Sequence, residues 1–465
     1  MLPDEAKLSK VMRDAEEKEL KAYVDTAASA TLLDAAPAGG TIAKTAAKDA
    51  IGITEWELSN GVKVVLKPTT FREDEILFTA TSPGGTSLAS DQDYIPALTA
   101  TQLVTAGGVG KLNVTDYRKV MTGKIATANP FIRELEEGLS GSSSRKDLET
   151  MFQLIYLRFT QPRADAAAVA AQAAQMKTML ANQNATPNFV FGDAINSTLY
   201  QNHLRRRALT AAMVDEWNLD KSLAFYKDRF ADASDFTFVF VGSFDPATMK
   251  PLVEKYLGGL PSTRRKETWK DVGVKTATGA IEKTVEKGIE PKSQAVIVYT
   301  GPFEYNQTQR IAIRAMAEIL QTRLLELIRE DLGGTYSITA AAQYSKLPRP
   351  DYQIRISFGS DPARNADLVG RVLKEIEDFK ASGPTEKQLN DQKEALLRDF
   401  EANSKQNAYL MGQLSLKYQY GEDPATLWEI PEHYKKLDAA TIQQAAKTYL
   451  NSANRLKVVL MPEKK

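Results

Sequence analysis

The chain has 465 residues, and its 59 basic and 59 acidic side chains give a formal net charge of zero. This balance provides no global field that would attract nucleic acid or an acidic membrane surface. The chain has no cysteine, which excludes a disulfide scaffold, thiolate metal sites and a cysteine nucleophile. No run of about 18 apolar residues occurs, so no membrane-spanning helix is predicted.

The first 52 residues are highly charged and then rich in alanine, glycine and threonine. They contain the breaker Pro37-Ala38-Gly39-Gly40, and we interpret residues 1–52 as a charged arm or linker between larger units. No apolar stretch typical of a signal peptide occurs there. The protein is therefore either cytosolic or derived from a longer precursor.

From Glu55 onward the pattern is that of an α+β domain. Two β-like runs flank Ser59-Asn60-Gly61, which indicates a hairpin because Asn-Gly suits the positive φ of a tight turn. Further strands are predicted at 76–82 and 236–241, and the serine-rich run 140–144 is predicted to be a loop. Helices are predicted at about 94–106, 115–122, 146–160, 164–184, 188–202 and 218–231.

A turn-rich, charged stretch at 258–280 is the best candidate for a domain boundary. Beyond it the order of elements repeats, with strands at about 281–287, 294–300, 335–345, 351–358 and 456–461. Helices are predicted at about 307–331, 363–381, 385–404, 406–420 and 439–451.

The repeat extends to individual segments, because residues 229–242 align with residues 449–462 at an offset of 220 positions. We therefore predict two homologous α+β domains, each a sheet covered by helices, at 53–262 and 275–465.

Zinc peptidase chemistry on such a fold needs two histidines and a glutamate on one helix face. The helix in the corresponding place, 95–104, contains no His, Glu, Asp or Cys. Its equivalent in the second domain, 311–325, contains Glu318 but no histidine. The chain has two histidines, His203 and His433, which lie on opposite sides of the domain boundary. The sequence therefore predicts no metal site in this chain.

Residues 325–338, LELIREDLGGTYSI, resemble a signature of the insulinase/pitrilysin metallopeptidases. The signature is an arginine at a helix end, a glycine turn and a tyrosine seven residues after the arginine. Here these are Arg329, the turn Gly333-Gly334, and Tyr336. Further segments similar to bacterial two-half zinc proteases of that family lie at 82–94, 138–163, 200–207, 229–245 and 301–310.

The resemblance implies the LuxS/MPP-like metallopeptidase fold and the role of a C-terminal half, which lacks zinc. Zinc and the catalytic ligands would lie in an N-terminal partner half, and the two halves would enclose a peptide substrate. Carried over, Arg329 would hold a substrate carbonyl or carboxylate, and Tyr336 would donate its hydroxyl to the oxyanion. The turn Gly333-Gly334 would let both side chains face the chamber. The resemblance also implies export to the periplasm.

Other interpretations remain open at this point. Arg329 also suits the dipole at a helix C-terminus, and Tyr336 also suits a strand. A non-peptidase scaffold, such as a core subunit of a larger complex, and a module that captures peptide without cleaving it are alternative functions. The cluster Arg205-Arg206-Arg207 is interpreted as a solvated face or a set of intrachain ion pairs.

Overall fold

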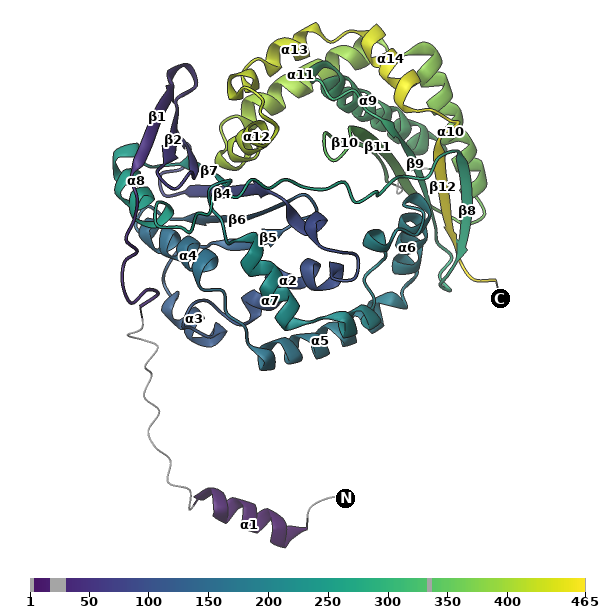
Figure 1. Ribbon diagram of the computed structural model, residues 1–465. Coiled ribbons are helices and arrows are strands. Elements are labelled where there is room, and N and C mark those ends of the chain that lie inside the picture. Colours follow the sequence, from purple (N-terminus) through teal and green to yellow (C-terminus); the bar gives the residue numbers. More distant parts are fainter. Residues whose placement is uncertain (1–3, 17–30, 333–336, 465) are drawn as a thin grey trace.

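The computed structural model describes residues 4–16, 31–332 and 337–464. Two mixed sheets, each packed with helices, occupy separate parts of the molecule and are connected by the extended segment 258–280 (Figure 1). The predicted α+β architecture is confirmed. No helix in the described ranges is long and apolar enough to cross a membrane.

The first sheet has seven strands among the described residues, in the order β1-β2-β3-β7-β4-β6-β5. The strands are β1 (Ile42–Lys48), β2 (Ile53–Leu58), β3 (Lys63–Pro68), β4 (Ile76–Pro83), β5 (Asn129–Ile132), β6 (Glu136–Ser143) and β7 (Thr237–Gly242). The predicted hairpin joins β2 to β3, with Gly61 at φ 95°. Strand β1 adds to the sheet from within the segment predicted as an arm.

Helices cover one face of the first sheet and enclose an aromatic core. The helices of this domain are α2 (Tyr94–Ala106), α3 (Val114–Val120), α4 (Leu148–Thr160), α5 (Ala166–Asn184), α6 (Pro187–Leu199), α7 (Leu219–Arg229) and α8 (Pro246–Leu252). In the core, the ring of Phe240 stacks between Phe78 and Phe152, with centroids 5.7 and 5.5 Å away. An N-terminal helix, α1 (Glu5–Glu16), lies away from the domain (Figure 1).

The prediction of a loop at 140–144 was wrong, because most of this run belongs to β6. The strand is made of small residues because neighbouring backbone lies close to it. A Cβ on Gly138 would lie 2.0 Å from the Ala80 carbonyl oxygen, and one on Gly141 would lie 2.0 Å from the Thr127 carbonyl oxygen. Glycine and serine therefore indicate close packing here and not a turn.

The second sheet has five strands among the described residues, in the order β10-β11-β9-β12-β8. The strands are β8 (Ala280–Glu286), β9 (Ser293–Pro302), β10 (Ile338–Ser345), β11 (Asp351–Ser360) and β12 (Arg455–Met461). The helices are α9 (Gln307–Leu332), α10 (Asn365–Ser382), α11 (Glu386–Asn403), α12 (Asn407–Tyr420), α13 (Ile430–Lys436) and α14 (Ala439–Tyr449).

The strand orders confirm the internal duplication. Strands β5-β6-β4-β7-β3 of the first sheet correspond in order and direction to β10-β11-β9-β12-β8 of the second. In each sheet the strand that comes first along the chain within this unit pairs in parallel with the strand that comes last. Strand β3 pairs with β7, and β8 pairs with β12. Strands β1 and β2 extend only the first sheet.

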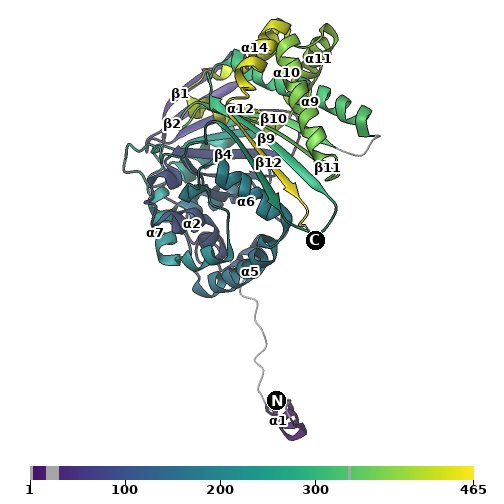
Figure 2. The ribbon, with the colours of Figure 1, turned by 90° about the vertical axis from the view of Figure 1, so that its right-hand side faces the viewer.

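The two domains exchange one helix each. Helix α6 of the first domain packs its apolar side chains on strands β8, β9 and β12 of the second sheet (Figure 2). Helix α12, 220 positions later, packs on strands β4 and β7 of the first sheet (Figure 1). Polar contacts fix its N-terminal end, where the Asn407 amide donates to Glu75 at 2.9 Å and its oxygen accepts from Thr69 at 2.6 Å. Each domain therefore completes the other.

The exchanged helix predicts coupled unfolding of the two domains. Leu414 of α12 is fully buried at 0% exposure in the core that α12 shares with the first sheet. We expect Leu414→Ala to lower the free energy of unfolding by about 2–5 kcal/mol, because it leaves a cavity. Urea denaturation followed by circular dichroism and tryptophan fluorescence measures this. The matched control Leu98→Ala removes a leucine that is 41% exposed and should cost less than about 1 kcal/mol. Equal costs would contradict the role of α12.

Candidate functional site

Helix α2 contains residues 95–104, where zinc peptidase chemistry would need two histidines and a glutamate. It follows β4 and the 3₁₀ helix η3 (Gly85–Leu88), which gives the expected strand, turn and helix. Tyr94 and Ile95 pack against Met213 and Trp217, and the Ser222 hydroxyl donates to the Pro96 carbonyl at 2.8 Å. These side chains do not fit a zinc ion, because apolar groups and a bonded hydroxyl supply no ligand set. Within the described ranges, no group of three or more His, Cys, Asp or Glu side chains is arranged to hold a metal.

The turn before α2 is held by a buried carboxylate. The Gly85 amide donates to Glu137 of β6 at 2.6 Å, and Glu137 is only 1% exposed. Gly85 has φ 64°, and a Cβ there would lie 2.2 Å from the Arg133 carbonyl oxygen, so this position requires glycine. Burial raises the pKa of Glu137 to about 7, against the Gly85 hydrogen bond and the charge of Arg229.

Arg229 connects this turn to the interdomain segment. Its guanidinium lies 3.9 Å from Glu137 and 2.9 Å from Glu267, and it also pairs with Asp228. Glu267 belongs to the segment 258–280, and further along it the Lys270 amide donates to the Ser87 hydroxyl at 3.0 Å. The charged groups therefore fasten the interdomain segment to the turn that precedes α2.

The arginine cluster forms intrachain contacts, which confirms its interpretation. Arg205 is buried, and its guanidinium donates to Asp91 at 2.8 Å and to the Thr86 and Ala89 carbonyls at 2.8 and 2.7 Å. The other two arginines form ion pairs, Arg206 with Glu134 at 2.5 Å and Arg207 with Glu216 at 2.9 Å. His203 Nδ1 accepts from the Arg205 amide at 3.2 Å, so this histidine caps a 3₁₀ turn. The cluster braces the same turn before α2.

The predicted Arg329 and Tyr336 pair lies at the junction of α9 and β10. Arg329 falls in the last turn of α9, but its side chain lies outside the described residues, as do Gly333, Gly334 and Tyr336 entirely. Their roles therefore stay predictions. Among the described strands β10 is an edge strand that pairs only with β11. The Gln321 side chain of α9 accepts from the Ala340 amide at 3.0 Å, so one donor on this edge is already bonded.

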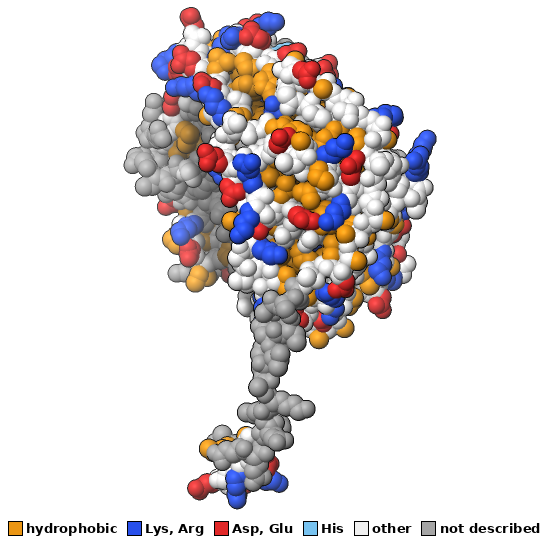
Figure 3. Space-filling model, turned by 90° about the vertical axis from the view of Figure 1, so that its left-hand side faces the viewer, with side chains coloured by type: hydrophobic (Ala, Val, Ile, Leu, Met, Phe, Trp, Pro, Cys, Tyr) orange, Lys and Arg blue, Asp and Glu red, His pale blue; other side chains and the backbone are white. Residues whose placement is uncertain are grey.

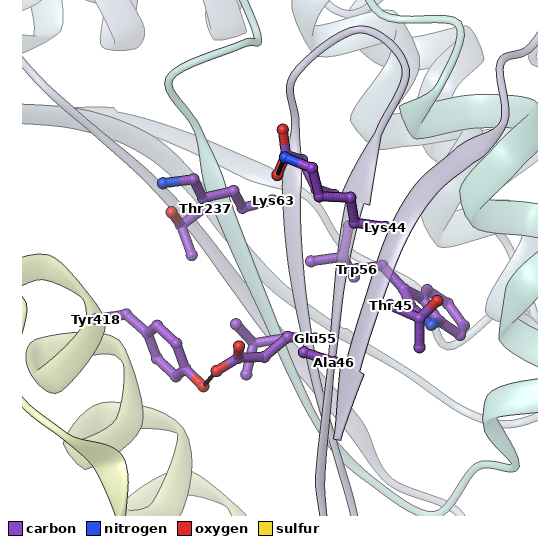
Figure 4. Close-up of a pocket in the computed structure, with 11 residues that line it drawn as sticks. Lys44, Thr45, Ala46, Glu55, Trp56, Lys63, Thr237 and Tyr418 are labelled. Carbon is purple, nitrogen blue, oxygen red and sulfur yellow. Dashed lines mark hydrogen bonds and ion pairs between the residues drawn. The ribbon is translucent and has the colours of Figure 1, made fainter. Parts of the chain in front are cut away.

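A groove of about 410 Å³ opens on the first sheet, beside the C-terminal end of α12 (Figure 4). The Tyr418 hydroxyl of α12 donates to Glu55 of β2, and Lys44 pairs with Glu57 at 2.9 Å. Burial and the Glu55 carboxylate raise the pKa of Tyr418, which keeps it a neutral donor. The Glu55–Tyr418 pair spans 363 positions, so no local motif could reveal it. Its described lining residues bring together no pair of nucleophile and base, and its Glu55–Tyr418 contact joins the two domains.

The molecular face on the side of β1 and β2 carries both signs of charge. Figure 3 shows basic and acidic side chains interspersed across this face, with hydrophobic side chains between them. This agrees with the zero net charge and provides no extended basic surface of the kind that nucleic acid requires.

A family model and several known proteins are similar to this chain. Residues 216–396 match the family model described as the peptidase M16 inactive domain. The chain is 25% identical over 457 residues to the "Probable zinc protease PqqL" of Escherichia coli, covering 96% of this chain and 48% of that protein. It is 24% identical over 431 residues to the "Zinc protease PQQL-like" protein of Arabidopsis thaliana, covering 89% and 42%. The chain thus spans about half the length of the curated relatives it matches.

Two solved structures of one related protease, the whole chain and its first half, can be compared with this fold. The periplasmic protease PqqL from Escherichia coli superposes with a TM-score of 0.82 at 23% identity, over 99% of this chain and 51% of that one. The first half of that protease alone gives 0.68 at 12% identity, covering 88% of this chain and 92% of that one. The better superposition therefore lies in the second half. A peptidase M16 inactive domain from Pseudomonas fluorescens gives 0.73 at 18% identity and covers 89% of this chain and 98% of that one.

The raised pKa of Glu137 predicts a pH-dependent stability. Between about pH 4.5 and 7 the folded protein keeps a proton that the unfolded chain releases, so the free energy of unfolding falls as the pH rises. We expect this group to contribute a loss of about 1–3 kcal/mol between pH 5 and pH 8. Glu137→Gln should reduce that loss, measured by urea denaturation at each pH.

A residual slope is expected in Glu137→Gln, because burial also raises the pKa of Asp235 to about 6. The control Glu432→Gln changes an exposed carboxylate that pairs with Lys435 and should keep the original pH profile. An unchanged profile in Glu137→Gln would contradict the assignment.

Proposed function

We propose, from the premise that this chain belongs to the M16 peptidase family and contains its inactive domain, that it is the zinc-free C-terminal half of a two-half metallopeptidase. It binds peptide substrate and closes a chamber around the zinc site of an N-terminal partner half. The match covers 48% and 42% of two of the relatives, which supports the proposal that this chain corresponds to one half of such a protein.

The observation that carries the proposal is the architecture around α2. The turn, the helix and the charged groups that brace them are fully formed, yet no side chain of α2 can bind zinc. The fold that elsewhere in the family supports catalysis is thus complete here without catalytic ligands. Such a domain can still enclose and position a substrate.

Arg329 and Tyr336 are the residues that act on substrate in this proposal. The planar guanidinium of Arg329 holds a substrate carbonyl or carboxylate through two parallel hydrogen bonds. Tyr336 would donate its hydroxyl to the oxyanion that develops on the substrate carbonyl, while zinc in the partner half would supply the Lewis acid. Their separation of seven residues, at a junction between a long helix and an edge strand, supports the pairing.

We also propose a periplasmic location, because one of the similar structures is described as a periplasmic protease. The alternative function is a scaffold without peptidase activity, and a further one is capture of peptide without cleavage. The three candidate functions, peptidase half, scaffold and peptide capture, differ in whether this chain binds peptide and in whether it restores cleavage by a zinc-bearing partner half.

Mixing the halves tests the proposal directly. The chain alone should bind an unstructured fluorescent peptide, measured by anisotropy, but should not cleave it. The zinc-bearing half alone should be nearly inactive, and adding this chain should restore cleavage in proportion to complex formed, measured by mass spectrometry of the products. Zinc, measured by atomic absorption, should be found in the sample of the partner half and not in the sample of this chain. Binding without restored cleavage would favour capture, and neither binding nor cleavage would favour the scaffold.

Substitutions at the predicted pair test the site itself. In the reconstituted enzyme we expect Tyr336→Phe to lower kcat by about 10²–10³, because one oxyanion donor is lost. Arg329→Ala should abolish detectable cleavage while zinc stays bound. The controls Arg398→Ala, which removes an exposed arginine of α11, and Tyr200→Phe, which removes a hydroxyl beside α6, should leave turnover unchanged. Wild-type turnover in both variants at the predicted pair would refute the assignment.

A further inference from the structure

A second cavity, of about 140 Å³, lies inside the helical layer of the second domain. It is lined by Arg310 and Arg314 of α9, Tyr344 of β10, Tyr409 and Lys417 of α12, and Tyr434 of α13. We call it the tyrosine–arginine cavity. These residues come from four elements that are distant in sequence, and the duplicated fold brings them together.

Two cations share one carboxylate at this cavity, whereas the lining residue Arg314 has two carboxylate partners of its own. Lys417, with a side chain 7% exposed, and Arg310, with a side chain 13% exposed, share one carboxylate, that of Glu422, at 3.1 and 3.3 Å. The Nε of Arg310 is buried and has no hydrogen-bond partner among the described residues. A third cation, Lys346, lies over the ring of Tyr305, 5.8 Å from its centroid. Two buried cations with one carboxylate are costly unless a further anion balances them.

Three tyrosine hydroxyls supply neutral donors at the same cavity. The hydroxyls of Tyr344, Tyr409 and Tyr434 form no hydrogen bond to another described residue, and none of the three is a fully buried, unpartnered atom such as the Arg310 Nε. Burial raises the pKa of all three, to about 12 for Tyr434, while the charge of Arg314 acts to lower each of them. All three hydroxyls therefore lie within electrostatic reach of one guanidinium and remain protonated at neutral pH.

Arg314 connects the cavity to solvent. Its side chain is 47% exposed, its Nε donates to Glu318 at 2.7 Å, and its Nη2 pairs with Asp399 at 3.9 Å. Among the described residues, Nη1 has no ion pair. A volume of about 140 Å³ corresponds to roughly four or five water molecules, or to one anion of a few heavy atoms.

We propose that the tyrosine–arginine cavity binds a small oxyanion, a carboxylate or a phosphoryl group. The anion neutralises the excess charge of Arg310 and Lys417 and accepts hydrogen bonds from the free Nε and the tyrosine hydroxyls. The group reaches the cavity past Arg314. The chemistry fits a free inorganic anion and equally the carboxylate of a peptide, and the proposal does not depend on zinc or on a partner half.

Isothermal titration of the full chain with sodium phosphate, at constant ionic strength set with sodium chloride, tests the proposal. We expect saturable binding at one site. Arg314→Gln and the triple variant Tyr344→Phe, Tyr409→Phe, Tyr434→Phe should each weaken it by about tenfold or more, because hydrogen bonds to a charged group are lost. Arg398→Gln makes the same charge change on α11, and Tyr200→Phe removes a hydroxyl elsewhere, and both should leave binding unchanged.

A second arm identifies the source of the anion. A short peptide that ends in glutamate is titrated beside its amidated glutamine counterpart. Tighter binding of the acidic peptide, weakened by the same variants, assigns the cavity to peptide carboxylates, and binding of phosphate alone assigns it to a free anion. Absence of saturable binding by both probes, or binding that the cavity variants leave unchanged, overturns the proposal. Thermal unfolding of each variant confirms that it is folded.

Discussion

The exchange of α6 and α12 between the two sheets is the interaction on which the rest of the structure depends. Each sheet has one face covered by helices of its own domain, while its other face is covered in part by a helix of the opposite domain. Since neither open face is satisfied alone, the domains cannot separate without exposing apolar surface. The relative position of α2, α9 and the groove at Tyr418 is fixed by this packing.

That constraint explains why a domain without metal ligands keeps the complete architecture. Residues that brace the turn before α2, such as Glu137 and Arg229, also fasten the segment between the domains. Loss of the turn would therefore also disturb the connection between the domains. A catalytic helix can lose its ligands at little structural cost, whereas the surrounding charges cannot be removed one at a time without leaving a buried partner unpaired.

The sequence predicted most helices and strands, because their apolar periodicity and turn signals are local. Strands β1, β5 and β6 and helices α8 and α13 were not predicted, and for two of these strands the physical reason is clear. Strand β1 is a mostly exposed edge strand, and Gly138 and Gly141 in β6 are dictated by the approach of neighbouring backbone. The positions of the two histidines, far apart and outside residues 95–104, could be read directly from the sequence. The exchanged helices, the Glu55–Tyr418 contact and the tyrosine–arginine cavity could not, because they depend on residues brought together over long distances in the chain.

Buried cations have different numbers of carboxylate partners in the two domains. In the first domain Arg229 and Arg265 share the carboxylates of Asp228 and Glu267, and Arg229 also lies 3.9 Å from Glu137, whose pKa burial raises to about 7. In the second domain Arg310 and Lys417 share Glu422 alone. A structural network tends to close its own charges, because any imbalance reduces stability. An imbalance that persists beside an open cavity with unbonded hydroxyls is what a site for a diffusible anion requires.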